Sequence, residues 1–184
     1  MDGKMRAKRH KVLFGVRRSV RYHSRRWRFF DRLNQVFSFV FVLFGAAAIL
    51  AMFQGWPFIP QIAAAIVTIA GGIDLVVGTA RMSCLHQALM RQFITLEKDI
   101  VRIDPEAITD EEIREFKARQ LDIEVDEPPV MRGLNVLCHN EVSRSLGYGR
   151  DVPGAYIPLG RMRRWLAQFV DFEDDGPETA PQAS

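Results

Sequence analysis

Residues 33–73 read LNQVFSFVFVLFGAAAILAMFQGWPFIPQIAAAIVTIAGGI and contain no Asp, Glu, Lys, Arg or His. Charged residues make up 26% of the 184-residue chain, so this gap does not result from a low overall charge. A helix at the surface of a soluble domain carries charged side chains on its outer face, and this stretch has none. The stretch therefore excludes a single soluble domain with an exposed loop or helix in this region, and the rest of the chain is too short for a large multidomain enzyme.

The uncharged stretch is long enough for two membrane spans, because about 20 apolar residues cross the roughly 30 Å hydrocarbon core. We place the spans at about residues 36–53 and 58–78, with the turn QGWP between them, and so predict a two-transmembrane hairpin over residues 34–80. A signal peptide is an alternative for the first span, but its charged region is normally short. Here about 35 residues precede the span, and a second span follows it. A buried helical hairpin of a soluble protein is the alternative for both spans.

Basic residues are concentrated before the apolar stretch. Residues 1–32 hold 12 of the 25 Lys and Arg residues and only two acids, a net charge of +10, whereas the remaining residues carry −7. A basic flank beside a span stays in the cytoplasm. Since two spans return the chain to the same side, the sequence predicts a multi-pass protein of the bacterial inner (cytoplasmic) membrane with both termini in the cytoplasm. Cys84 and Cys138 fall on that side, where thiols stay reduced.

The N-terminal basic region divides into two predicted parts. Residues 1–11 are expected to be disordered, and residues 12–33 are expected to form an amphipathic interfacial helix. Arginines at steps of three and four form a basic stripe along this helix: Arg18, Arg21, Arg25, Arg28 and Arg32. Such a helix suits the anionic cytoplasmic leaflet, either to enforce topology or to recognise particular lipids. No nucleic acid is expected as a partner, because no base-reading motif accompanies these charges.

Apolar residues continue at helical spacing beyond the second span, which predicts one continuous helix from Pro60 to Ile103. They follow alternating steps of four and three, the a/d pattern of a heptad repeat. This candidate seam consists of Met82, His86, Leu89, Phe93, Leu96 and Ile100. Two arrangements are open: the seam joins copies of the chain in a coiled coil, or it packs on the helices that follow it in the same chain.

Residues 81–172 are predicted to form a cytoplasmic helical region. Thr109 with Glu112 three positions later is a capping box, which predicts a helix over residues 109–121. A second amphipathic helix is predicted over residues 130–146, followed by a loop. No strand and no internal repeat is indicated, so the predicted fold class is an all-α membrane protein.

The C-terminal part of this region combines basic and aromatic residues. A helix over residues 159–172 places arginines beside Trp and Phe, like the N-terminal segment. It either rests on the cytoplasmic membrane face or packs on the helical bundle. Residues 173–184 are acidic, contain proline and lack periodicity, and are expected to be a disordered tail.

Small residues share one face of the second span, and small residues let helices approach closely in lipid. The candidate pore or helix-packing face consists of Ala63, Val67, Ala70, Gly71, Asp74 and Gly78. Ala64, Thr68 and Gly72 lie beside it at steps of four. Asp74 is the only ionisable residue in either span. It either lines a pore in a homo-oligomer or, being near the cytoplasmic end, reaches the interface or Arg81.

Catalytic and cofactor motifs are absent from the sequence. It contains no Gly-rich phosphate loop, nucleophile elbow, HExxH or paired-Cys motif, so we expect no enzyme, no cofactor and no metal site. The segment CHNE at residues 138–141 contains reactive residue types. Successive residues of a helix point about 100° apart, so these four cannot converge without help from elsewhere. We interpret Cys138 as a buried structural thiol.

Several segments resemble one known family. The segment YHSRRWRFFD at residues 22–31 leads into the hairpin, and a long helix with Arg81 and His86 follows. These features, with EPP at residues 127–129 and CHNE at residues 138–141, are similar to prophage-type members of the SLATT family. These are two-transmembrane effector domains of bacterial nucleotide-signalling conflict systems. The resemblance implies a two-span hairpin with cytoplasmic helices and an effector, pore-forming or membrane-perturbing, in antiviral or cell-suicide systems.

The sequence therefore predicts an oligomeric integral membrane effector that forms a pore or perturbs the membrane. Its expected partners are anionic membrane lipids, further copies of the chain and a regulatory protein. Two alternatives stay open. The first is a membrane-anchored scaffold without pore activity, and the second is a holin-like phage membrane protein, against which the large cytoplasmic portion argues.

Overall fold

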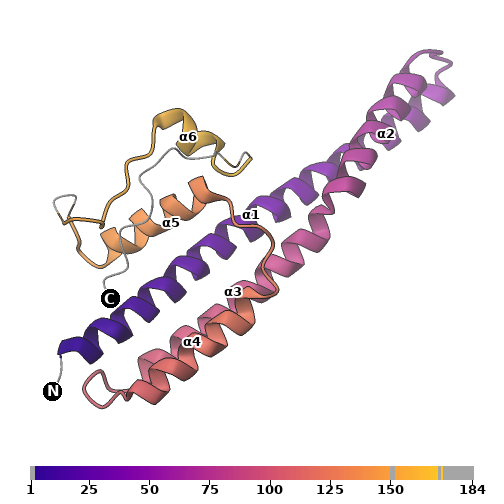
Figure 1. Ribbon diagram of the computed structural model, residues 1–184. Coiled ribbons are helices and arrows are strands. Elements are labelled where there is room, and N and C mark those ends of the chain that lie inside the picture. The colour runs from indigo at the N-terminus through magenta and orange to yellow at the C-terminus, as the bar shows by residue number, and fades with distance from the viewer. Residues whose placement is uncertain (1–2, 150–151, 170, 172–184) are drawn as a thin grey trace. The chain divides into compact units, whose positions relative to one another are not determined.

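The computed structural model describes residues 3–149, 152–169 and 171, and helices are its only regular elements there (Figure 1). The helices are α1 (Gly3–Phe53), α2 (Ile59–Val77), α3 (Thr79–Arg102), α4 (Asp110–Glu124), α5 (Arg132–Ser145) and α6 (Arg161–Leu166). The all-helical expectation is confirmed. The predicted tail at residues 173–184 lies outside the described residues.

The chain forms two compact units. Unit 1 comprises residues 1–22 and 91–184, and unit 2 comprises residues 23–90. The helices α1 and α3 each contribute to both units, since α1 begins in unit 1 and ends in unit 2, and α3 does the reverse.

Unit 1 contains the larger apolar core. Three helices and one loop supply its buried residues: the N-terminal part of α1, the second half of α3, the loop before α4 and the N-terminal half of α4. These residues are Val12, Leu13, Val16, Phe93, Leu96, Ile100, Ile108, Ile113 and Phe116. The capping box that was predicted at the start of α4 is present, with the Thr109 side chain accepting from the Glu112 backbone N–H at 3.2 Å. A second cluster joins Tyr22 to α5 through Leu134 and Cys138.

The expectation of a disordered segment at residues 1–11 is wrong for residues 3–11, because α1 begins at Gly3. Ion pairs with distant residues hold this segment: Arg6 pairs with Glu106, and Lys8 contacts Asp110 at 2.6 Å. The Arg9 guanidinium donates to the Ile100 carbonyl at 3.1 Å, one of the last carbonyls of α3 that lack a partner inside their own helix. Sequence composition alone does not reveal partners so far along the chain.

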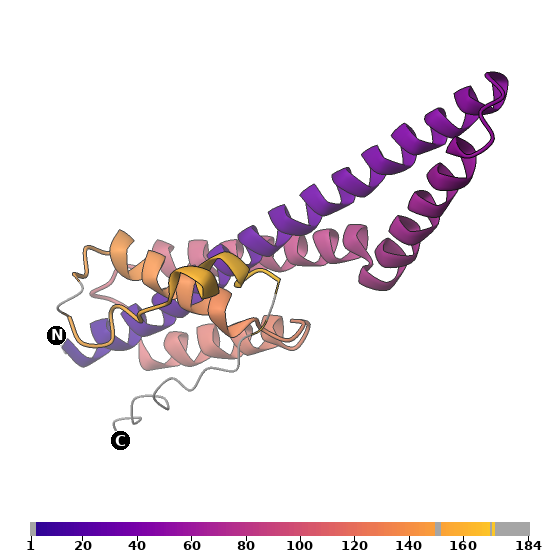
Figure 2. The ribbon, with the colours of Figure 1, turned by 90° about the horizontal axis from the view of Figure 1, so that it is seen from above.

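Unit 2 contains the apolar stretch. The second half of α1 and all of α2 are joined by residues 54–58, where Gly55 has a positive φ of 68° (Figures 1 and 2). Pro60 lies in the first turn of α2, where its missing N–H removes no helical bond. Ala51 and Ala63 are buried near the turn, and small side chains let two helices approach closely.

The predicted continuous helix from Pro60 to Ile103 is interrupted. Gly78 adopts the left-handed conformation with φ 62° and ψ 51°, and its N–H donates to the Asp74 carbonyl at 2.7 Å. This is a glycine C-cap, which ends α2 at Val77 and lets α3 begin at Thr79. Figure 2 shows the change of chain direction at this point. The spacing of the apolar residues is helical on both sides of Gly78, so the spacing did not reveal the break.

Substitution of Gly78 by alanine is expected to lower the free energy of unfolding by about 1–2 kcal/mol, the cost of a left-handed L-residue. The added Cβ would lie 3.9 Å from the Arg81 Cβ, so no clash adds to this cost. Chemical unfolding in detergent micelles, followed by circular dichroism, measures the change. The control is Gly45→Ala, because a Cβ at Gly45 meets nothing within 4 Å and alanine favours the helix. Equal effects at both positions would contradict the role of Gly78.

Candidate functional site

The apolar surface of α1 and α2 is the most prominent chemical feature of the described residues. The helical stretches Gly3–Phe53 and Ile59–Arg102 are each long and apolar enough to cross a membrane. Only 6% and 11% of the residues in their most apolar windows are buried, whereas the core helix of a soluble protein would be mostly buried. Large exposed side chains include Phe39, Val42, Leu50, Phe53, Ile62, Ile69, Leu75 and Val76. A surface of this kind needs lipid or protein around it.

The candidate pore or helix-packing face lies on the less exposed side of α2. Ala63 is buried, and the other five members, Val67, Ala70, Gly71, Asp74 and Gly78, are partly buried. A Cβ added at Gly71 would lie 4.0 Å from the Phe41 ring of α1. This face therefore packs against the same chain. The neighbouring residues Ala64, Thr68 and Gly72 are exposed.

Asp74 interacts with polar side chains close to the Gly78 break. The Thr79 hydroxyl donates to Asp74 Oδ1 and lies 3.3 Å from Asn34 Oδ1 of α1. Thr79 is buried and links the start of α3 to both neighbouring helices. Thr79 is thus a partner of Asp74. Arg81, which the sequence offered as one of several alternatives, is exposed. A threonine directly after a C-capping glycine was the signal that could have identified it.

A buried pair of histidines lies outside the two predicted spans. His23 of α1 and His86 of α3 place their Nδ1 atoms 3.0 Å apart. The Phe30 ring stacks on His86 at 5.7 Å between centroids, and the Arg26 guanidinium lies 4.5 Å from the centre of the Phe30 ring. Burial, together with the nearby His23 and Arg26, lowers the pKa of His86 to about 3. His86 is therefore neutral at physiological pH.

The sequence identified His86 as a packed seam residue but did not pair it with His23. Within unit 2, Leu89 of the seam is also buried and Met82 is half-buried. Within unit 1, Phe93, Leu96 and Ile100 are completely buried in the core formed with α1 and α4. Of the two arrangements that the sequence left open, the burial of these residues in a core shared with α1 and α4 favours packing within one chain.

The basic stripe on α1 does not act as a unit. Arg21 donates to the Ser145 hydroxyl of α5 at 3.0 Å, and so fastens α5 within unit 1. Arg28 is exposed and donates to Ser24 one turn earlier. Arg32 is exposed, while Arg18 and Arg25 are half-buried. Part of the stripe therefore holds the fold, and the exposed arginines remain available to a charged surface.

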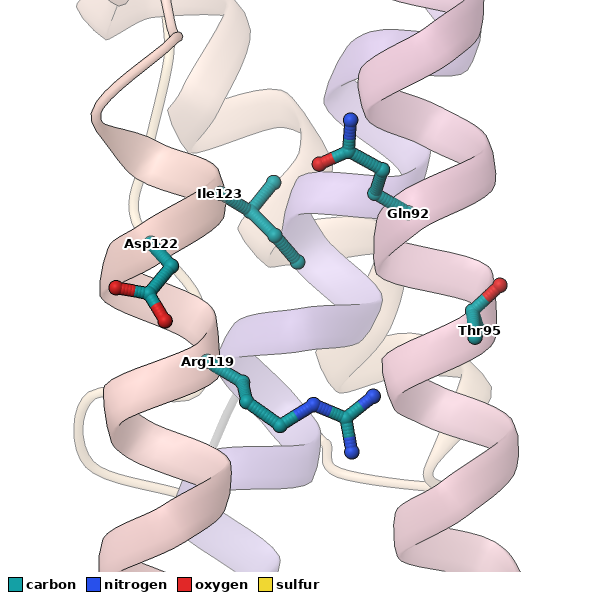
Figure 3. A pocket seen from close by; sticks show the side chains of 5 residues that line it. All are labelled: Gln92, Thr95, Arg119, Asp122 and Ile123. Carbon is teal, nitrogen blue, oxygen red and sulfur yellow. The ribbon is translucent and has the colours of Figure 1, made fainter.

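A shallow groove of about 350 Å³ lies between α3 and α4 (Figure 3). Its lining residues are Gln92, Thr95, Arg119, Asp122 and Ile123. Arg119 points across the groove and donates to Asp99 at 2.7 Å, so its charge is balanced within the fold. Among the residues that the structure describes, no three His, Cys, Asp or Glu side chains lie close enough together to hold a metal ion.

The CHNE segment at residues 138–141 joins α5 to Tyr22 of α1 and to the loop at Ile157. Cys138 is completely buried against Tyr22, and the Asn140 side chain bonds both backbone groups of Ile157.

No known protein family, characterised protein or solved structure matches the chain. The fold and the site define an all-helical protein with two helices long and apolar enough to cross a membrane.

Proposed function

We propose that the protein is an integral membrane effector that forms a pore or perturbs the bilayer. In this proposal α1 and α2 cross a bacterial inner membrane as a hairpin, with both termini in the cytoplasm. The observation that carries it is the exposed apolar surface of both helices, which lipid would cover. The concentration of basic residues before the first span supports the orientation.

Association of several copies would have to use a surface that the hairpin leaves open. The face from Ala63 to Gly78 packs on α1, but Ala64, Thr68 and Gly72 remain exposed beside it. A Cβ at Gly72 would meet nothing within 4 Å, so the backbone is open to a neighbouring helix there. Small residues at steps of four favour close helix association in lipid. We therefore assign copy-to-copy contact to this second face and helix packing within the chain to the first.

The resemblance to SLATT effectors supports a role in antiviral or cell-suicide systems. A regulatory protein or signal would act on unit 1, which is built around a separate core. The burial of the seam weighs against the scaffold alternative, because a scaffold would need that surface to recruit its partner. The test of the proposal is release of a trapped dye.

Purified protein in liposomes is expected to release trapped dye faster than an inert two-span protein. Gly72→Leu should lower the release roughly tenfold, since the loss of about 1.4 kcal/mol of association corresponds to that factor. The matched control is Ala46→Leu, which adds a large side chain to an exposed position of α1. Release no greater than that of the inert protein would contradict the pore proposal, as would equal release from wild type and Gly72→Leu.

A further inference from the structure

The segment around α6 exposes large apolar side chains next to arginines. Met162, Trp165 and Phe169 are 75%, 85% and 67% exposed, and the spacing of Met162 and Trp165 places these two on one side of α6. Arg161, Arg163 and Arg164 alternate with them, and no Asp or Glu occurs from residue 152 to residue 169. We call these six residues the α6 patch. The patch offers an apolar surface beside three arginines.

Hydrogen bonds to α5 hold the backbone on both sides of the α6 patch within unit 1. Before the helix, the Asn140 side chain donates to the Ile157 carbonyl at 2.7 Å and accepts from the Ile157 N–H at 2.9 Å. After the helix, Asp171 accepts from the Arg132 N–H at the start of α5, at 2.8 Å. Ala167 is completely buried. The chain is therefore anchored to α5 on both sides of α6, and the apolar side chains are exposed although their backbone is held.

This arrangement decides between the two interpretations that the sequence left open for the segment. If α6 packed on the bundle through its aromatic residues, Trp165 would be buried, but Ala167 occupies the buried position. Exposing the side chains of Trp, Met and Phe to water costs about 25 cal/mol of free energy for each Å² of apolar surface. A binding partner that covers this surface must accept an indole and also carry negative charge.

We propose that the α6 patch docks on the surface of an anionic lipid bilayer. Tryptophan favours the headgroup region, and arginines beside it can keep their guanidinium groups at the phosphates while their alkyl parts follow the apolar side chains. The charge of the patch is complementary to the cytoplasmic leaflet. The inference rests on the proposed function only in that membrane insertion brings a bilayer within reach, and it does not depend on pore formation.

The experiment uses the full chain with Trp165 as its only tryptophan, made by replacing Trp27 and Trp56 with phenylalanine. The protein is reconstituted in vesicles of phosphatidylcholine alone or mixed with phosphatidylglycerol. In the anionic vesicles we expect Trp165 fluorescence to be quenched by lipids brominated on their acyl chains and protected from acrylamide in the water. In the neutral vesicles, acrylamide should quench it much more strongly.

Variants test the part played by the arginines. One arginine near an anionic surface changes the docking equilibrium about fivefold, so Arg161→Gln with Arg164→Gln should shift it on the order of 25-fold toward accessible Trp165. The matched control is Arg114→Gln with Lys117→Gln, which removes the same charge from exposed positions of α4. A shift of equal size in the control would mean that net charge acts without the patch, and would overturn the proposal.

Two further results would contradict lipid docking. The first is equal quenching by acrylamide in both kinds of vesicle. The second is protection of Trp165 from acrylamide in the absence of quenching by brominated lipid. If this protection increases with the protein-to-lipid ratio, a second copy of the chain, not lipid, covers the α6 patch. Failure of the proposed function is read separately: a chain that is not inserted is released from the same vesicles by alkaline carbonate, whatever the state of Trp165.

Discussion

Replacing Phe93 by alanine is expected to lower the free energy of unfolding by about 3–5 kcal/mol, the usual cost of removing a buried phenyl ring. Phe93 is completely buried in the core of unit 1, between the first turns of α1 and the N-terminal half of α4. The particle size in detergent should stay unchanged, because the seam packs within one chain. Chemical unfolding measured together with size-exclusion chromatography and light scattering tests both expectations.

The adjacent residue provides the control for Phe93. Ile94 is 43% exposed, so Ile94→Ala should change the free energy of unfolding by no more than about 0.5 kcal/mol. A coiled coil between copies would behave differently from an internal core. Phe93→Ala would then dissociate the particle, and the midpoint of unfolding would depend on protein concentration. Such a result would contradict the intramolecular seam.

The seam also shows how far the sequence could predict the fold. Its spacing identified the buried side of α3 residue by residue, from His86 to Ile100. Spacing describes only one helix, however, and a heptad pattern is the same whether the opposing surface comes from another copy or from the same chain. The missing information was that α1 begins at Gly3, and that depends on partners such as Glu106 and Asp110, about a hundred residues away.

The sequence likewise predicted the helix faces of the candidate site but not their contacts. The small-residue face of α2 was visible in the sequence because it is periodic, and the capping box of α4 was visible because Thr109 and Glu112 are three residues apart. The contact of Asp74 with Thr79 depends on the left-handed conformation of Gly78, which interrupts an otherwise regular pattern. The contact of His23 with His86 joins positions 63 residues apart. Local patterns therefore predicted the helices and their faces, but not the contacts between them.

The histidine pair leads to the second large expected effect, a loss of stability in acid. His86 has a pKa of about 3 in the folded chain and an ordinary value of 6.5, so below pH 6.5 the unfolded chain binds more protons. Its contribution to stability is complete above pH 6.5 and is lost as the pH falls from 6.5 toward 3. Over that range the free energy of unfolding should fall by about 1 kcal/mol for each pH unit.

Substitution of His86 by glutamine should remove most of this pH dependence. Glutamine can still hydrogen-bond to His23 Nδ1 but takes up no proton, so the two variants should differ mainly in acid. The control is His10→Gln, which removes an exposed imidazole from α1 and should leave the slope between pH 6 and pH 4 unchanged. Chemical unfolding in detergent at a series of pH values measures the slopes. Equal slopes for His86→Gln and wild type would show that protonation of the pair is not what destabilises the fold. A flat curve for wild type would contradict the prediction, because a buried imidazole that stays neutral beside Arg26 and His23 must lose stability as the pH falls.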